Sequence, residues 1–305
     1  MTTMATPKQS APMLQTQDYN PTSESTGTKR AKSVAFHAVA LALTGVVLYP
    51  ALWMIASSFK PNSEIGGTNT SLWSSNFSFD NFVTAMDGIG GVTTLQFFTN
   101  SLILAIGAVV GTVLSASVSA YAFARIKFPG RSIFFGMMIA TLLLPFHVVI
   151  IPQYIIFNQL GLVDTYIPLL IGKFLAADAF FVFLMVQFMR NLPAELDEAA
   201  RIDGAGHVRI FCSIMLPLMK PALISTSIFS FIWSWNDFLG PLLYLNTPEK
   251  YPLPLALRLF VDQTQSSDYG AMIAMSVLAL LPVLIFFLVF QRYIVEGVST
   301  QGLKG

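Results

Sequence analysis

The sequence is poor in charged residues. Only 11% of its 305 residues are charged and 54% are hydrophobic, whereas about 25% are charged in a typical soluble domain. So few charged side chains cannot coat a soluble enzyme of this length. The formal net charge of +1 leaves no basic face for nucleic acid. What remains is a polytopic membrane protein, in which the few charges mark helix ends or functional positions.

Cysteine and histidine are also scarce. The single Cys excludes a disulfide framework, and no Cys and His spacing is typical of a zinc site. The chain also lacks the G-x-x-x-x-G-K-[ST] pattern that cradles nucleotide phosphates. We therefore expect this chain itself to bind no metal and no cofactor.

Long apolar stretches account for most of the chain. A membrane-spanning helix needs about 20 predominantly apolar residues. Four stretches without Asp, Glu, Lys or Arg are long enough, and two more are interrupted by only one or two charges. The sequence therefore predicts an all-α fold with six transmembrane helices, within residues 33–59, 88–124, 132–163, 166–189, 221–245 and 269–291.

Basic residues fall mainly on one side of these six helices. With the N-terminus inside the cell, 13 of the 17 Lys and Arg residues lie on the cytoplasmic side. Cytoplasmic loops are rich in such residues, so both termini are expected in the cytoplasm. Residues 1–33, rich in polar residues, are predicted to form a disordered cytoplasmic extension. Residues 34–292 then hold the six spans, and 293–305 form a cytoplasmic tail.

The cytoplasmic loop 190–220 is too polar and too long for a simple connector. It holds eight charged residues in 31, the densest cluster in the chain. Acids at its start favour a helix, Asp197 and Arg201 have the spacing of an i,i+4 ion pair, and Gly204 should end that helix. A second short helix should follow and end against Pro217. Three acids disfavour a helix lying on the bilayer, so a protein partner fits better.

The same loop carries a spaced signature. Glu198-Ala199-Ala200 is followed after three residues by Gly204, and Leu216-Pro217 closes the pattern. This pattern resembles the EAA signature of bacterial ABC-importer permeases, in the maltose-type carbohydrate-uptake branch of the binding-protein-dependent transport inner-membrane components. The likeness covers roughly residues 34–305, and three more stretches are similar to that family: Ser58-Phe59-Lys60, Trp235-Asn236-Asp237-Phe238, and the end from Gln291-Arg292-Tyr293 to Gly305.

The resemblance implies a permease (ABC transmembrane type-1) domain in the bacterial cytoplasmic membrane. Such a permease pairs with a second related permease, two cytoplasmic ATPase subunits and an extracytoplasmic solute-binding protein. ATP and Mg²⁺ belong to the ATPase, so the chain itself is not expected to be an enzyme. The solute is expected to be a sugar: an oligosaccharide, a disaccharide or a related polyol phosphate. The residues expected to couple to the ATPase are Glu198, Ala199, Ala200, Asp203, Gly204, Ala205 and Pro217.

The C-terminal tail is the second expected contact with the ATPase. Three glycines and small polar residues after Glu296 make a poor helix, so the free segment should be flexible. In the resembling family this tail reaches between the two ATPase subunits. The resemblance therefore implies that Thr300, Gln301 and Lys304 contact the ATPase.

Candidate pathway residues cluster in the fifth apolar stretch. Asp237 lies there beside Trp233, Trp235 and Asn236, and an ionisable residue inside a span suggests function. Aromatic faces, amides and carboxylates are groups that bind sugars. An Asp–Asn pair can equally fix one helix against another. Because this motif recurs in the family whichever sugar is carried, we favour a structural or gating role.

An independent six-span secondary carrier or channel is the alternative function. Such a carrier needs ionisable residues near the bilayer midplane and an internal repeat, and the chain has one deep acid, Asp237, and no clear repeat. Lys173 and Asp178 are five residues apart, a poor spacing for a pair on one helix. Lys173 is expected to reach the outer interface instead.

Overall fold

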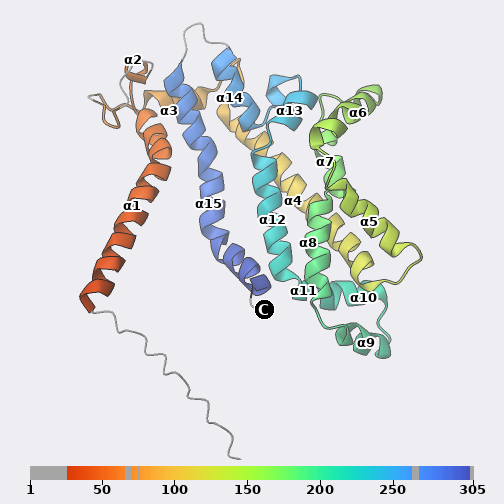
Figure 1. Cartoon of the computed structure of the whole chain (residues 1–305). Coiled ribbons are helices and arrows are strands. Elements are labelled where there is room, and N and C mark those ends of the chain that lie inside the picture. Colours follow the sequence, from red (N-terminus) through yellow and green to blue (C-terminus); the bar gives the residue numbers. More distant parts are fainter. Residues whose placement is uncertain (1–25, 66–70, 75, 263–267, 303–305) are drawn as a thin grey trace, which may run out of the picture. The chain divides into compact units, whose positions relative to one another are not determined.

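The structure, a computed structural model, describes residues 26–65, 71–74, 76–262 and 268–302 (Figure 1). The regular structure of these residues is helical, and their one extended pairing is an isolated bridge between Ile89 and Val92. This confirms the predicted all-α fold. The chain divides into two compact units, Met1–Ala51 and Leu52–Gly305.

The first unit contains most of α1 (Thr26–Ser57). Within α1, Lys32–Ser57 is a 26-residue segment apolar enough to cross a membrane, which agrees with the predicted first span. Because α1 begins at Thr26, the end of the extension predicted to be disordered is helical. The rest of that extension, residues 1–25, lies outside the described residues.

The second unit contains the other helices. The long apolar ones are α4 (Thr94–Arg125), α7 (Ile167–Phe174) with α8 (Ala179–Arg190), α12 (Lys220–Trp235) and α15 (Tyr269–Gly302). The shorter ones are α2 (Asn62–Ile65), α3 (Asp80–Asp87), α5 (Arg131–Thr141), α6 (Phe146–Gln159), α9 (Glu195–Ile202), α10 (His207–Ile210), π-helix η1 (Phe211–Met215), α11 (Leu216–Leu218), α13 (Leu239–Tyr244), 3-10 helix η2 (Pro248–Lys250) and α14 (Leu253–Asp262).

The predicted spans are all helical, but not all are continuous. Within the described residues, four helices are long and apolar enough to cross a membrane, or five if the bent pair His207–Leu218 and Lys220–Trp235 is one span. The predicted third span, 132–163, is divided into α5 and α6. Pro145 is the N-cap of α6. It has no amide hydrogen to continue the helix before it, which explains the division.

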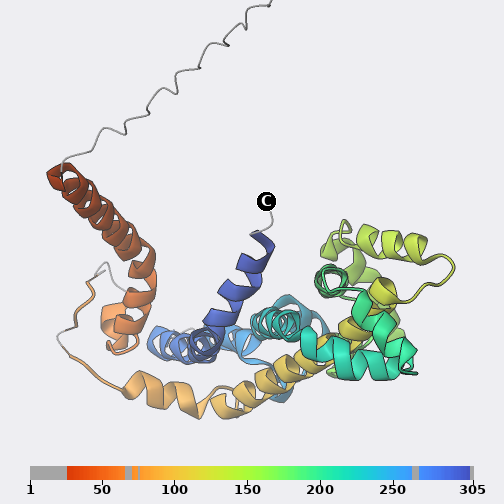
Figure 2. The same cartoon turned by 90° about the horizontal axis from the view of Figure 1, so that it is seen from below.

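α4 is the central helix of the second unit. It packs against α12, α8 and α7, which lie along it in both views (Figures 1 and 2). Small side chains allow these close contacts: Ala108 and Ala116 are almost fully buried. A Cβ added at Gly111 would fall 2.8 Å from Cδ2 of Phe174. A larger residue at this position would therefore force the Phe174 side chain of α7 to shift.

The Ser58-Phe59-Lys60 stretch is a structural element of the second unit. Ser58 and Lys60 are buried, and Nδ2 of Asn81 donates hydrogen bonds to the backbone oxygens of both, at 2.9 and 2.7 Å. Nζ of Lys60 donates to the carbonyl oxygen of Ser71. The motif therefore fixes the chain that follows α1 onto α3.

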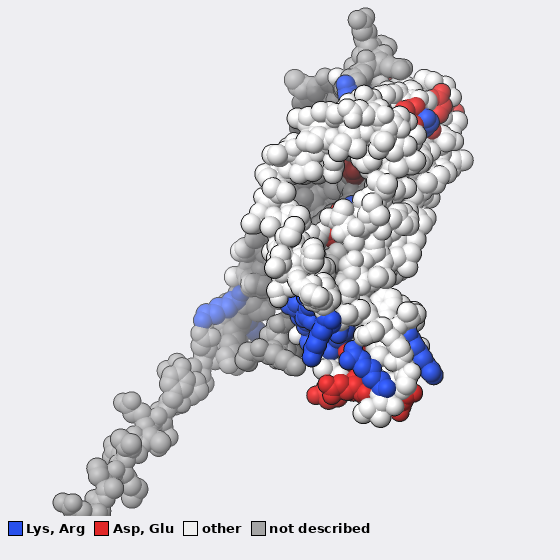
Figure 3. Space-filling view, turned by 90° about the vertical axis from the view of Figure 1, so that its right-hand side faces the viewer, with Lys and Arg blue, Asp and Glu red and all other residues white. Residues whose placement is uncertain are grey.

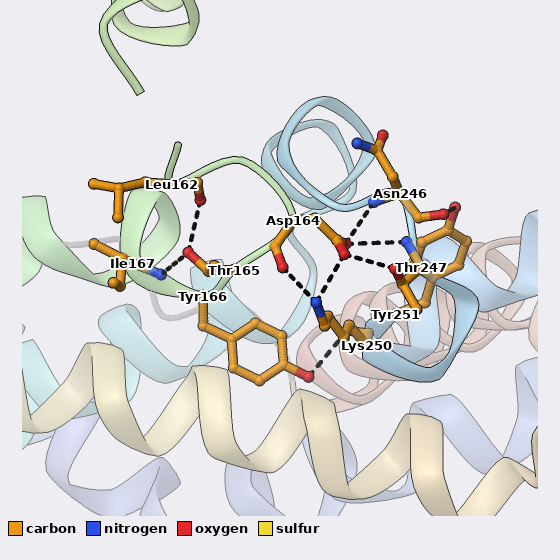
Figure 4. A network of polar contacts seen from close by, with 9 residues as sticks. All are labelled: Leu162, Asp164, Thr165, Tyr166, Ile167, Asn246, Thr247, Lys250 and Tyr251. Carbon is orange, nitrogen blue, oxygen red and sulfur yellow. Dashed lines mark hydrogen bonds and ion pairs between the residues drawn. The ribbon is translucent and has the colours of Figure 1, made fainter. Parts of the chain in front are cut away.

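A polar network joins the segment after α6 to the segment after α13 (Figure 4). The Asp164 carboxylate accepts hydrogen bonds from the amides of Asn246 and Thr247, at 2.9 and 3.0 Å, and from the Thr247 hydroxyl at 2.6 Å. Nζ of Lys250 donates to that carboxylate at 2.7 Å and to the Asp164 carbonyl at 2.6 Å. The Tyr166 hydroxyl donates to the Lys250 carbonyl at 3.0 Å. One carboxylate thus holds the two segments together.

The network also controls the ionisation of Asp164. Partial burial raises the pKa of this carboxyl, but the hydrogen bonds from Lys250, from Thr247 and from the two backbone amides outweigh burial and hold the pKa well below its usual range. The backbone φ of Asp164 is 64°, in the left-handed region. Such a conformation costs a residue with a β-carbon about 1–2 kcal/mol, and Asp tolerates it better than most residues.

Asp164→Asn is expected to destabilise the protein by about 1–2 kcal/mol at neutral pH, because the amide cannot pair with Lys250 as an ion. Since the folded pKa is depressed, the stabilisation is complete above the ordinary carboxyl pKa of about 4 and is lost as the pH falls towards the folded pKa. Thermal unfolding of the purified protein at several pH values measures this. Equal melting temperatures of variant and wild type at pH 7 would contradict it.

Candidate coupling loop and polar cavity

The loop 190–220 folds as the sequence predicts, into a helix, a turn and a second helical segment. α9 carries three acids in its first turn, which complement the helix dipole. Gly204 follows it with a φ of 79°, which glycine adopts without strain. No atom within 4 Å would meet a Cβ at Gly204, so the turn needs glycine for its backbone conformation and not for space. Figure 1 shows α9 and α10 beyond the lower ends of α8 and α4.

The second helical segment does not end at Pro217 as predicted. α10 continues through η1 and α11 to Leu218, and the chain then bends by 76° into α12. Pro217 normally breaks a helix, because it lacks an amide hydrogen and its ring meets the carbonyl four residues earlier. Here the wider π-helix precedes it, and the amide of Leu216 bonds to the carbonyl of Phe211, five residues back. The π-helix therefore accommodates the proline.

A buried ion pair anchors α9 to the end of α4. Nε of Arg125 lies 3.3 Å from Oδ2 of Asp197, and the two side chains are only 8% and 6% exposed. Nη2 of Arg125 also donates to the carbonyl oxygens of Met189 and Leu192, each at 2.8 Å. The predicted pair of Asp197 with Arg201 is therefore wrong. Asp197 faces inward, where Arg125 is its ion-pair partner among the described residues.

A second contact attaches the other side of the turn to the same helix. The Tyr121 hydroxyl lies 3.1 Å from Nδ1 of His207, and the Tyr121 ring packs against Phe211 with centroids 5.2 Å apart. The amide of Ala205 bonds to the carbonyl of Ala200 at 2.9 Å and closes the turn. The loop is therefore held to α4 both before and after Gly204.

The anchoring leaves one face of the loop exposed. Of the residues expected to contact a partner, the structure exposes Glu198, Ala199, Asp203, Gly204 and Pro217, half-buries Ala205, and buries Ala200. Ala200 packs into the core beside α8, so it cannot enter a groove of another protein. The sequence did not single out two apolar side chains on the exposed surface, Ile202 and Val208, which are 86% and 78% exposed.

The four predicted pathway residues do not lie together. Trp233 and Asp237 line one cavity of about 190 Å³, with Lys173 and Ser234 among its other walls. Trp235 is buried on another side of α12, and its Nε1 donates to the carbonyl of Ala279 at 3.2 Å. Asn236 donates back to Ile232 at 2.8 Å within its own helix. Of the four, Trp233 and Asp237 therefore share a cavity, whereas the side-chain hydrogen bonds of Trp235 and Asn236 lie elsewhere.

A broken helix places a charged pair beside this cavity. Between α7 and α8, Ala176 has a φ of 56°, and Nζ of Lys173 lies 2.8 Å from Oδ2 of Asp178. Five residues is a poor spacing for a pair on one continuous helix, but the break at Ala176 brings the two charges together. The expectation that Lys173 reaches the outer interface stays a prediction. Figure 3 shows acidic and basic atoms in a hollow of the otherwise uncharged middle of the molecule.

The cavity combines an aromatic face, a carboxylate and a paired ammonium. Oδ1 of Asp237 accepts a hydrogen bond from the amide of Gly240 at 3.1 Å, which fixes the side chain. A few polar groups in a mostly apolar cavity orient a small ligand. With Leu104, Leu169 and Leu170 as apolar walls, the arrangement suits a solute with hydroxyl groups and apolar C–H faces.

The backbone of the C-terminal tail is helical for longer than predicted. α15 extends to Gly302 and so includes Thr300 and Gln301, whereas Lys304 lies outside the described residues. The expectation that the residues after Glu296 form a poor helix therefore does not hold for the backbone as far as Gly302. Once a helix is nucleated, extending it by one residue costs only the free energy set by that residue's helix propensity. For Gly this cost is about 1 kcal/mol relative to Ala.

The chain matches known proteins over most of its length. Residues 107–300 match the family described as binding-protein-dependent transport system inner membrane component. The arabinooligosaccharides transport system permease protein AraQ of Halalkalibacterium halodurans is 35% identical over 262 residues, covering 85% of this chain and 92% of that protein. The diacetylchitobiose uptake system permease protein NgcG of Streptomyces coelicolor is 34% identical over 266 residues, covering 86% of each.

The fold is also known from a solved structure. A crystal structure of a bacterial ABC transporter involved in the import of the acidic polysaccharide alginate contains a chain of similar fold. The TM-score is 0.77 at 24% identity, over 87% of this chain and 97% of that one. The family match covers more than half of the sequence, and relatives above 30% identity span nearly all of it. The chain therefore belongs to the binding-protein-dependent transport system inner membrane component family.

Proposed function

We propose that the chain is the membrane permease subunit of an ATP-driven importer for a sugar, working in the bacterial cytoplasmic membrane with both termini in the cytoplasm. The observation that carries the proposal is the anchored loop, which presents Glu198 and Ala199 outward while Arg125 and Asp197 hold it from inside. A loop built only to connect two spans has no use for such a buried anchor. Family membership disfavours the independent secondary carrier.

The proposed complex contains a second related permease, two ATPase subunits and an extracytoplasmic solute-binding protein. The sequence has no phosphate-cradling motif, so ATP and Mg²⁺ would be bound by the ATPase and the permease itself would not be an enzyme. The exposed face of α9, with its acids and with Ile202 at its end, is the surface offered to the ATPase. Thr300, Gln301 and Lys304 remain proposed as a second contact.

α4 provides a direct connection between this loop and the cavity. Arg125 lies at the loop end of α4, and Leu104 of the same helix lines the cavity. The two residues are separated by roughly 30 Å along the axis at 1.5 Å per residue. Because α9 is attached to α4 by a buried pair, a movement of α9 on the ATPase moves α4 with it. This supports a role of the loop in coupling ATP hydrolysis to the cavity.

The charges around the cavity favour a neutral sugar as the solute. Lys173 is already paired with Asp178, and Asp237 adds a second acid to the same region. A negatively charged polyol phosphate would meet more negative than positive charge there. An oligosaccharide or disaccharide can instead place a C–H face on Trp233 and hydroxyl groups on Asp237. These two residues would then form part of the substrate pathway.

Gly204→Val is expected to reduce sugar uptake and ATPase stimulation roughly tenfold, since a β-branched residue at a φ of 79° is strained by about 1–3 kcal/mol. Gly206→Val is the matched control, because Gly206 has an ordinary φ of −76° and equally open surroundings. Uptake of a labelled sugar by the reconstituted complex measures both. Normal coupling in the Gly204 variant would refute the coupling role of this turn.

Asp237→Asn should lower uptake about tenfold or more, the effect of losing one hydrogen bond to a charged group. The variant still accepts the hydrogen bond from Gly240, so the local backbone is preserved. Asn236→Ala is the control, because Asn236 bonds only within its own helix in the described structure. The readout is uptake of a panel of labelled sugars at matched permease levels. Equal uptake by the Asp237 variant and the control would exclude Asp237 from the pathway.

A further inference from the structure

A basic cavity lies between α4, α5 and α8, away from the coupling face and the polar cavity. Its volume is about 430 Å³, within the usual range of about 300–1,000 Å³ for small-ligand sites. Its lining contains three cations and no acid: Lys127, Phe128, Arg131, Ser132, Phe135, Gly136 and Arg190. Figure 3 shows basic atoms gathered at the lower edge of the uncharged body, above the acids of the lowest part.

The three cations are placed around the cavity and are not neutralised by acids. The guanidinium of Arg190 lies over the Phe135 ring, 4.7 Å from its centroid. Nη1 of Arg131 donates to the carbonyl of Ile126 at 3.3 Å, a bond that uses one of its five N–H donors. Among the ion pairs of the described residues, none includes Lys127, Arg131 or Arg190. Their combined positive charge therefore remains available to an anion from outside the chain.

The start of α5 adds the positive end of its helix dipole to these charges. Gly130, with a φ of 79°, is the N-cap of this 11-residue helix and provides no side-chain cap. The amide of Arg131 already donates to the Phe128 carbonyl at 3.3 Å, so the start of α5 acts mainly through the positive end of its dipole, which favours an anion there. Arg131 and Ser132, the first two residues of α5, line the cavity.

The surface next to the cavity is apolar. Ile133, Phe134 and Met137 of the same helix are 69%, 55% and 60% exposed. A soluble phosphate would need only the cations, whereas a phospholipid needs both an anion site for its headgroup and an adjoining apolar surface for its acyl chains. Cationic pockets between spans at the cytoplasmic face are known to hold anionic headgroups.

We propose that this cavity binds the phosphate headgroup of an anionic phospholipid, with the acyl chains along the exposed face of α5. The site is separate from the proposed transport function and does not depend on it. Arg131 and Arg190 come from different helices, α5 and α8, so a bound phosphate would join these two helices at the membrane surface. The lipid would thereby fix α5 next to the anchored end of α4.

The test is binding of phosphatidylglycerol to the purified full chain, measured by native mass spectrometry against phosphatidylcholine. The wild type is expected to prefer phosphatidylglycerol by roughly tenfold or more, and Arg131→Gln/Arg190→Gln is expected to lose that preference because two of the three cations are removed. Arg209→Gln/Lys220→Gln is the matched control, with the same loss of charge outside the cavity. It should bind like the wild type.

Further arms identify the anion and control for misfolding. Millimolar inorganic phosphate should not displace the lipid, and displacement would show a site for a soluble anion and overturn the lipid proposal. Arg131→Lys/Arg190→Lys keeps both charges and should retain the lipid preference. This variant provides the test if the double Gln variant fails to fold. The proposal would also be overturned if the Gln variant showed the same lipid preference as the wild type. It would be overturned as well if the Lys variant and the control both lost the preference.

Discussion

Arg125 and Asp197 lie in a contact with little access to solvent, and neither charge has another neutralising partner among the described residues. Removing one partner of such a buried pair leaves an uncompensated charge, at a cost of about 3–5 kcal/mol. α9 therefore cannot separate from α4 without a large penalty. The presentation of the exposed loop face and the connection to the cavity depend first on this contact, and the contact of Tyr121 with His207 supports it from the other side of the turn.

The packing of α4 explains how a contact at its end can affect the distant cavity. Alanines along the helix are buried, and Gly111 lies against the Phe174 ring, so α4 packs closely against α7, α8 and α12. Close-packed helices transmit displacement because they cannot be compressed. A displacement at Arg125 is therefore shared by the helices that line the cavity, including α12 with Trp233.

The sequence predicted the features that depend on local chemistry and missed those that depend on distant partners. Apolar length predicted the all-α fold, and Gly204 predicted the turn, because glycine adopts a left-handed backbone with the least strain. The Arg125–Asp197 pair joins segments far apart in the chain, so spacing assigned Asp197 to Arg201 instead. The Lys173–Asp178 pair depends on a break at Ala176, and an alanine with positive φ leaves no signal in a sequence. The helix end predicted at Pro217 was wrong, because the π-helix before it has no sequence signature.

The break between α7 and α8 has a consequence for how this fold can change. Lys173 lies in the last turn of α7, and Asp178 is the N-cap residue of α8. The cation therefore lies at the negative end of one helix dipole, and the carboxylate lies at the positive end of the other. The pair thus serves the two helix ends that the break creates, and the polarity beside the cavity comes from the backbone arrangement. Trp233 and Ser234 lie on a different helix, α12. If this cavity holds the solute, as proposed, substitutions at Trp233 and Ser234 would change which solute a descendant protein accepts and leave the Lys173–Asp178 pair intact.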